Sequence, residues 1–148
     1  MLDVSRIMEK LNLYYGSSRK TTLNRMRENP DPFKILVGCL VSINIKDEVC
    51  EKILEELFSK VNNFHDIIKI NDEELQDILY NARYRKIKAT ILKSVSREIL
   101  ERFNGEVPSE RDQLLSIKGI GPKTCNVVLA FAFRKKVIPV DTNVHRIF

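Results

Sequence analysis

The sequence contains few of the residues that mark several classes of protein. Five glycines and five prolines among 148 residues are too few for the many tight turns of an all-β fold. The three cysteines, Cys39, Cys50 and Cys125, are an odd number and do not have the spacing of metal ligands. Neither a disulfide framework nor a metal site is therefore indicated, as expected of a reduced intracellular chain.

Long apolar runs are also absent. The longest apolar window, Ile35 to Ile45, is much shorter than the ~20 residues that a membrane-spanning helix needs. Residues 1–10 mix charges of both signs and lack the apolar core of a signal peptide. We therefore expect an intracellular protein, in the cytoplasm or nucleoid, with no membrane partner, and we expect it to be a monomer.

Charge is nearly balanced in total but unevenly distributed along the chain. Lys and Arg number 25 against 20 Asp and Glu, which leaves a net charge of +5. Acidic residues concentrate in 47–56 and 72–77, whereas basic residues concentrate in 83–93 and 134–136. Such an asymmetry gives one face a positive potential that attracts a polyanion. The alternative is a set of ordinary solvated helix faces, and charge alone does not separate the two.

Apolar residues recur at helical spacing along nearly the whole chain, which predicts an all-α fold. Asp31 and Pro32 open a helix, Phe33 to Ile43, that is apolar on nearly every side and is expected to be buried all round. The stretch 16–32 is polar and broken, and it predicts a loop or short irregular helices. Further helices are expected after polar N-cap residues: from Val4 after Asp3, from 47 to 61 capped by Asp47, and from 72 to 79 after Asn71.

The second half of the chain continues this helical pattern. A basic segment carries apolar residues at four-residue steps, which indicate one face of a helix: Ile87, Ile91, Val95, Ile99 and Phe103. Asn104-Gly105 predicts a left-handed C-terminal end for that helix. The remaining elements are expected to be a helix from Ser109, a helix over 123–133, an extended link over 137–140 and a last helix from Asp141.

Two of these helices are joined by a short turn, Lys118-Gly119-Ile120-Gly121-Pro122-Lys123. Two glycines in three positions let the backbone turn sharply and approach another backbone closely. The unpaired N–H groups and the dipole at the start of the second helix form a phosphate site that ignores base sequence. Lys118 and Lys123 would add positive charge to it. The alternative is an ordinary helical hairpin with glycine in its turn.

Five segments carry a resemblance to a known family. They are 32–47, with P-F-x-x-L followed by Ser42 and Asp47; 83–89, with Tyr84 and Lys88-Ala89; 104–108, N-G-E-V-P; 114–128, L-L-x-I-x-G-I-G-x-K-T-x-N-V-V; and 140–146, V-D-T-N-V-H-R. From residue 31 to its end the chain resembles the helix-hairpin-helix DNA glycosylases of the endonuclease III type.

The resemblance implies a domain organisation. Residues 31–133 would form the six-helix barrel lobe, with the helix-hairpin-helix at 110–133. Residues 1–30 would be an N-terminal helix and loop that start the second lobe, and 134–148 a link and the first turns of its C-terminal part. Relatives continue for several helices, so we expect that lobe to be largely missing here. Many relatives also carry four cysteines that hold a [4Fe–4S] cluster; this chain supplies no cluster ligands, so we expect no cofactor unless a further segment carries them.

The resemblance also implies two catalytic residues, Lys123 and Asp141. A lysine in the first turn of a helix faces the positive end of the helix dipole, and partial burial would further favour its neutral amine. Such an amine can attack C1′ of a flipped-out nucleotide. Asp141 would accept the amine proton and stabilise positive charge on the sugar. The alternatives are a solvated lysine and a simple helix N-cap.

Four further residues are expected to contact DNA because of their positions in the family pattern. Asn44 stands where a polar residue fills the gap left by the flipped nucleotide. Tyr84 stands where an apolar wedge enters the duplex, and Arg83 and Arg85 flank it in place of the family's Gly and Tyr. The alternatives are a polar end of the central helix for Asn44 and a core tyrosine for Tyr84. With the hairpin, the expected DNA-binding set is Lys118, Gly119, Ile120, Gly121, Asn44, Tyr84, Arg83 and Arg85.

Together these features predict a base-excision-repair DNA glycosylase with AP (β-elimination) lyase activity. Its partner would be double-stranded DNA with a damaged base, an oxidised pyrimidine by resemblance, or an abasic site. The alternatives are a non-catalytic hairpin module that binds DNA, a monofunctional mismatch glycosylase, and a structural helical domain without a DNA partner.

Overall fold

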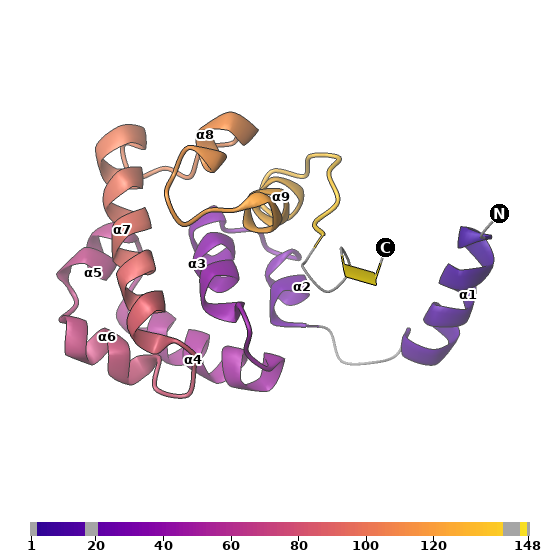
Figure 1. The fold of residues 1–148 in the computed structure, drawn as a ribbon, viewed down its shortest axis with the longest axis horizontal. Helices are drawn as coiled ribbons and strands as arrows, with labels where there is room; N and C mark the ends of the chain where they lie inside the picture. Colours follow the sequence, from indigo (N-terminus) through magenta and orange to yellow (C-terminus); the bar gives the residue numbers. More distant parts are fainter. Residues whose placement is uncertain (1–2, 17–20, 141–145, 148) are drawn as a thin grey trace.

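Helices make up the regular structure of this protein. The computed structural model describes residues 3–16, 21–140 and 146–147, and Figure 1 shows their arrangement. The helices are α1 (Val4–Tyr15), α2 (Thr22–Met26), α3 (Pro32–Ser42), α4 (Asp47–Lys60), α5 (Phe64–Lys69), α6 (Asp72–Ile78), α7 (Arg85–Phe103), α8 (Arg111–Leu115) and α9 (Pro122–Phe131). The predicted all-α class is confirmed. Within the described ranges, no helix combines the length and apolar character needed to cross a membrane.

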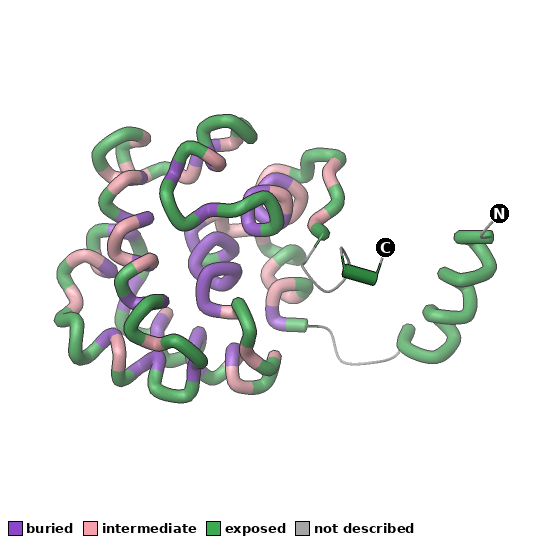
Figure 2. The backbone as a smooth tube through the Cα atoms, in the orientation of Figure 1, coloured by how far each residue is buried: buried purple, intermediate pink, exposed green. Residues whose placement is uncertain are grey.

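The helix α3 is the centre of the core. The Asp31 carboxylate accepts hydrogen bonds from the N–H groups of Phe33 and Lys34, 3.0 and 3.4 Å away, and so caps the helix at the proline. Every residue from Ile35 to Val41 is buried. Helices α2, α4, α7 and α9 contact α3; Figure 1 shows α3 among them, and Figure 2 shows it buried along most of its length. The expectation of a central helix buried all round is therefore confirmed.

The apolar face predicted for α7 does not pack against the core at its N-terminal end. Ile87 is 58% exposed, whereas Lys88, Leu92 and Ile99 are buried. A step of four residues overshoots a turn of 3.6 residues by about 40°, so a stripe at such steps winds around the helix. The end of α7 does follow the sequence, because Asn104 has φ 54° in the left-handed region.

Two predicted helix starts also differ in the structure. Lys46 precedes α4, so Asp47 is its first residue and not its cap. The Asp47 carboxylate instead accepts a hydrogen bond from the N–H of Thr22, 3.2 Å away, and so joins α2 to α4. Glu110, not Ser109, immediately precedes α8. The cap that the sequence predicts at Asn71 is present, with its side chain accepting from the N–H of Glu73.

The N-terminal helix α1 lies apart from the other helices (Figure 1). It has no buried residue, and Figure 2 shows it exposed along its length. The short helix α2, by contrast, packs against α3 and α4. The division of the chain into segments 1–30, 31–133 and 134–148 stays a prediction.

A buried lysine joins α7 to the end of α3. The ammonium of Lys88 donates hydrogen bonds to the carbonyl oxygens of Val41, at 2.8 Å, and Ile43. These are carbonyls at the C-terminal end of α3, where helical carbonyls lack N–H partners and carry the negative end of the dipole. Lys88 is only 5% exposed, and its burial lowers its pKa. One side chain therefore fixes the start of α7 against the end of α3.

Two cysteines lie in the same part of the core. Cys39 is on α3 and Cys50 on α4, and both are buried. Burial raises the pKa of the Cys39 thiol to about 12 and that of the Cys50 thiol to about 11. Both thiols therefore stay protonated in the folded chain at pH values at which an exposed thiol ionises.

Replacing the buried lysine is expected to destabilise the fold. Lys88→Met keeps much of the apolar stem but leaves the carbonyls of Val41 and Ile43 without their donor, which costs about 1–3 kcal/mol of unfolding free energy. Urea denaturation measures the change. The matched control is Lys86→Met, an exposed lysine on the same helix, which should change stability by less than about 0.5 kcal/mol. Equal stabilities for the two variants would contradict this role of Lys88.

The cysteines should make the fold sensitive to alkali. Between the ordinary thiol pKa of 9.0 and the folded values of about 11 and 12, the unfolded chain loses protons that the folded chain keeps. The free energy of unfolding therefore falls as pH rises, by at most about 2.7 kcal/mol per pH unit for two thiols. Denaturation at neutral pH and near pH ~10 should show a smaller alkaline loss in the double variant Cys39→Ala/Cys50→Ala. An unchanged loss would show that other groups cause it.

Candidate nucleic-acid interface

The turn between α8 and α9 needs glycine at one position. Gly119 has φ +103°, in the region that side chains rarely adopt. A Cβ there would also lie 3.1 Å from Ile91 and 3.3 Å from Val95, both on α7. Gly121 differs, because a Cβ at that position would meet nothing within 4 Å. The turn is thus pressed onto α7 at Gly119 and open at Gly121, where another molecule has room to approach.

Backbone donors gather at this turn. The N–H of Ile120 donates to the carbonyl of Ile117 at 3.1 Å, and the N–H of Lys118 donates to the Glu98 carboxylate at 3.2 Å. Within the described residues, the N–H groups of Gly119, Gly121 and Lys123 have no acceptor. They lie at or just before the start of α9, where the helix dipole is positive. The N–H groups that a phosphate site would need are therefore available in the described structure, and the binding of phosphate by this turn stays a prediction.

The side chains of the turn are divided between surface and core. Lys118 and Lys123 are exposed, as a contact with DNA requires. Ile120 is buried, so its side chain anchors the turn in the core and does not lie on the surface. The sequence analysis considered a partly buried Lys123, but the described residues leave this side chain exposed. Its positive charge is nevertheless close enough to the Cys39 thiol to oppose the rise in that thiol's pKa, which places Lys123 beside α3.

Asn44 and Tyr84 lie on the two sides of the Lys88 contact. Asn44 directly follows Ile43, whose carbonyl accepts from the Lys88 ammonium. The carbonyl of Tyr84 accepts from the backbone N–H of Lys88, 2.9 Å away. Both Asn44 and Tyr84 have left-handed backbones, with φ 58° and 61°, and both are exposed, Tyr84 to 53%. The structure therefore brings these two predicted residues together and excludes a core role for Tyr84.

A second tyrosine belongs to the same surface. The guanidinium of Arg83 lies 4.9 Å from the centre of the Tyr84 ring, and that of Arg85 lies 4.9 Å from the centre of the Tyr80 ring. Tyr80 is 67% exposed, and the sequence analysis did not identify it. The sequence signal for it was the order of tyrosines and arginines in this segment: Tyr80 is followed by Arg83, Tyr84 and Arg85. Alternating aromatic and basic side chains suit contact with nucleic acid.

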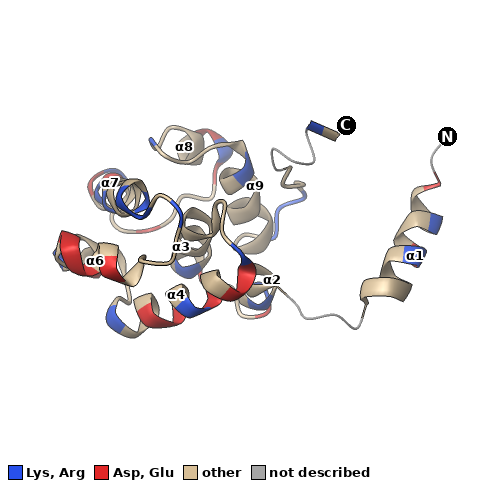
Figure 3. Cartoon of the chain, turned by 60° about the horizontal axis from the view of Figure 1, so that its bottom comes forward, with Lys and Arg blue, Asp and Glu red and all other residues tan. Residues whose placement is uncertain are grey.

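The predicted charge asymmetry is present, but part of the basic run is structural. Figure 3 shows acidic residues along α4 and α6 and basic residues near the start of α7. Within the run 83–93, Lys88 is buried, and Lys93 bonds to Asp72 and to the carbonyl of Ile70. Arg83, Arg85 and Lys86 are thus the basic side chains that this run offers to a partner.

The second basic run, 134–136, lies at the other end of α9. With Arg27, these residues line a cleft of about 510 Å³. The guanidinium of Arg27 stacks on Phe131, 5.4 Å from its ring centre, and Lys135 pairs with Glu110 at 3.2 Å. Because α9 separates this cleft from the glycine turn, the two basic surfaces are distinct.

Two further predictions concern cluster ligands and Asp141. Cys39, Cys50 and Cys125 are all buried, and no group of three His, Cys, Asp or Glu residues in the described part could hold a metal ion. These cysteines therefore do not fit a four-cysteine iron–sulfur cluster. Asp141 lies outside the described residues, so its pairing with Lys123 stays a prediction.

Comparison with known proteins places this arrangement in a family. A model of the HhH-GPD superfamily of base excision DNA repair proteins matches residues 37–148. Endonuclease III of Thermotoga maritima is 34% identical over 123 residues, which cover 83% of this chain and 58% of that protein. The chain therefore spans little more than half the length of that relative.

Solved structures agree with this assignment. A trapped covalent intermediate of endonuclease III with DNA superposes with a TM-score of 0.81 at 28% identity, over 99% of this chain and 68% of the other. A thermostable thymine-DNA glycosylase superposes with a TM-score of 0.83 at 26% identity, over 97% and 65%. With a glycine-rich turn whose N–H groups include three without an acceptor among the described residues, an all-helical fold and a family match over most of its length, the chain belongs to the HhH-GPD superfamily of base excision DNA repair proteins.

Proposed function

We propose that this chain binds damaged duplex DNA and forms the hairpin-bearing part of a DNA glycosylase with AP lyase activity. The proposed substrates are an oxidised pyrimidine and an abasic site. The observation that carries the proposal is the exposed Lys123 in the first turn of α9, beside a turn whose backbone donors lack acceptors in the described part of the chain. The position of a nucleophile next to a backbone clamp is what such chemistry requires.

The glycine turn would bind the DNA backbone. Free N–H groups at Gly119 and Gly121 can donate to phosphate oxygens, and the dipole of α9 favours the negative charge. The open space before Gly121 lets a phosphate approach the backbone. Because these contacts read no base, they would hold any duplex in register while the enzyme searches for damage.

Lys123 would then perform the covalent step. Its neutral amine attacks C1′ of the flipped nucleotide, the C1′–N bond breaks, and the base leaves with the bonding pair. The attached amine loses one proton, and we assign its acceptance to Asp141. The C1′–O4′ bond then breaks, O4′ takes up a proton, and a protonated imine forms between Lys123 and C1′. Loss of a C2′ proton from the imine then breaks the bond from C3′ to the phosphate oxygen. A nucleotide that covers Lys123 would supply the desolvation that favours its neutral amine.

Asn44 and Tyr84 would hold the duplex open. Tyr84 is exposed, and like Asn44 it lies beside a backbone carbonyl contact of Lys88, so it can enter the stack while the amide of Asn44 contacts the orphaned base. Arg83 stacks on the Tyr84 ring and can reach a neighbouring phosphate. Insertion of a side chain offsets the energy of unstacking the flipped nucleotide.

Borohydride trapping tests the covalent step. The chain is expected to form a covalent adduct with a duplex that contains an oxidised pyrimidine or an abasic site. Lys123→Ala should abolish the adduct, because it removes the amine. Lys118→Ala is the matched control: it removes an equal charge at the other end of the turn and should weaken binding without preventing trapping.

Two outcomes would change the proposed function. An undiminished adduct with Lys123→Ala would exclude that residue as the nucleophile. Salt-dependent duplex binding without any adduct, unchanged by Asp141→Asn, would favour a non-catalytic DNA-binding module.

A monofunctional mismatch glycosylase is the second candidate. The superposition on a thymine-DNA glycosylase favours it as strongly as that on endonuclease III, with TM-scores of 0.83 and 0.81. Release of thymine from a G·T mismatch without a trapped adduct would support this candidate.

Tyr84→Ala should reduce the preference for damaged over intact duplex. Stacking of one aromatic ring on a base contributes about 1–3 kcal/mol, so affinity for an abasic duplex should fall about 5- to 150-fold. Affinity for intact duplex should fall much less. Fluorescence anisotropy with both duplexes measures the ratio. Tyr14→Ala, an exposed tyrosine on α1, is the control, and an equal effect of both substitutions would argue against a wedge.

A further inference from the structure

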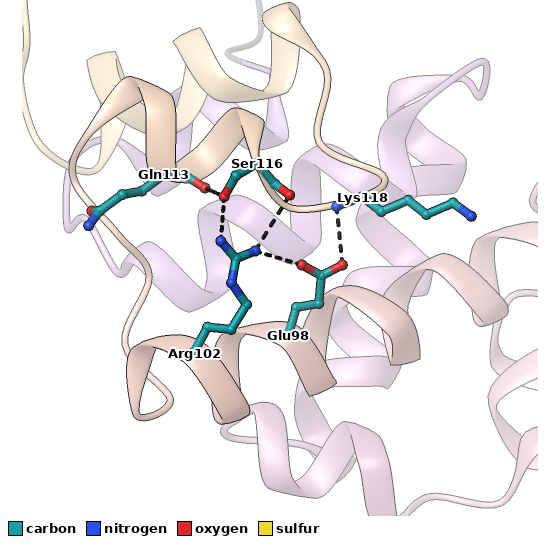
Figure 4. A network of polar contacts seen from close by, with 5 residues as sticks. All are labelled: Glu98, Arg102, Gln113, Ser116 and Lys118. Carbon is teal, nitrogen blue, oxygen red and sulfur yellow. Dashed lines mark hydrogen bonds and ion pairs between the residues drawn. The ribbon is translucent and has the colours of Figure 1, made fainter.

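A polar network on α7 holds the loop that leads into the glycine turn (Figure 4). One oxygen of the Glu98 carboxylate accepts from the backbone N–H of Lys118 at 3.2 Å, and the other accepts from Arg102 at 2.9 Å. Arg102 also donates to the Ser116 hydroxyl at 2.8 Å, and that hydroxyl donates to the carbonyl of Gln113 at 2.6 Å. Two side chains one turn apart on α7 therefore hold both ends of the loop 116–118.

The same helix also supports the turn by apolar contact. Gly119 packs against Ile91 and Val95 so closely that a Cβ would meet both side chains. The polar contact at Lys118 and the apolar contact at Gly119 involve neighbouring residues of the turn. Together they restrain the backbone on both sides of the peptide that joins these two residues, whose N–H, at Gly119, has no acceptor among the described residues.

Glu98 is a negatively charged residue beside a turn that is proposed to bind a negatively charged ligand. A carboxylate beside a surface that binds DNA repels phosphate and, by its charge alone, lowers the affinity. Its side chain is 27% exposed, so the charge is not hidden from an approaching polyanion, although Arg102 neutralises part of it. Because Glu98 contacts the backbone of the turn directly, it has a geometric role that can outweigh this repulsion.

We infer that Glu98 is a positioning residue for DNA binding. By accepting the N–H of Lys118, it holds the turn in the conformation that presents the N–H groups of Gly119 and Gly121 to a phosphate. This inference rests on the proposed binding of duplex DNA by the turn. On charge alone, removal of this negative group should strengthen binding to a polyanion. On the positioning role, its removal should weaken that binding.

Three variants of the full chain separate geometry from charge. Glu98→Ala removes both the acceptor and the charge, Glu98→Gln removes the charge but keeps an acceptor, and Glu101→Ala removes an exposed charge elsewhere on α7. Loss of one hydrogen bond predicts that Glu98→Ala binds an intact duplex about 2- to 12-fold more weakly than the parent. Glu98→Gln and Glu101→Ala should bind as tightly as the parent or more tightly.

Two further measurements distinguish a positioning role from a general loss of stability: the salt dependence of the affinity and the exchange rates of backbone amides. The slope of log affinity against log salt concentration should become shallower in Glu98→Ala, by up to about 0.9, the value for the loss of one phosphate contact. The slope should not change in this way in Glu98→Gln. In the parent chain, exchange of the Lys118 amide should be slower than that of Gly119, whose N–H has no acceptor in the described structure. This second measurement needs no variant, so it applies even where Glu98→Ala fails to fold.

The possible results overturn different statements. If Glu98→Ala binds as tightly as Glu98→Gln, or if the Lys118 amide exchanges as fast as that of Gly119, Glu98 does not position the turn. If the parent itself fails to bind duplex DNA at low salt, the proposed function fails, and the positioning role for DNA binding fails with it. Weaker binding of Glu98→Ala alone, with a protected Lys118 amide, supports the inference.

Discussion

The buried ammonium of Lys88 is the contact on which the geometry of the candidate interface depends. It donates to the carbonyls of Val41 and Ile43 at the end of α3, while its own N–H donates to the carbonyl of Tyr84 at the start of α7. Desolvation opposes a buried charge, but here the negative end of a helix dipole and two carbonyls offset part of that cost. Two left-handed residues, Asn44 and Tyr84, are consequently held on the two sides of this contact.

From this contact, α7 acts as a rigid spacer. Lys88 lies in its first turn, Ile91 and Val95 receive Gly119 further along, and Glu98 accepts the N–H of Lys118 beyond them. At 1.5 Å per residue, Lys88 and Glu98 are separated by about 15 Å along the axis. One helix thus sets the spacing between the proposed wedge and the proposed phosphate clamp. A change in the register of α7 would move both together relative to α3.

The sequence predicted well what local chemistry determines. Asp31 and Pro32 start α3, Asn104 ends α7, and the glycines of the turn mark its sharp bend, because each depends on dihedral preferences and nearby backbone groups. It predicted less well what distant contacts determine. Asp47 resembled a cap but bonds to Thr22, and Lys88 and Lys93 belonged to a basic run but bond to carbonyls of other helices. Nothing in the local sequence distinguishes such lysines from exposed ones.

The exposure of Lys123 divides the proposed chemistry into two parts. The described residues supply position: α9 orients the side chain, and the turn beside it offers donors for the DNA backbone. They do not supply the dry environment in which an amine loses its proton and attacks a sugar. On the proposed function, a flipped nucleotide that covers Lys123 supplies that environment. Such an arrangement would couple the covalent step to recognition of a flipped base.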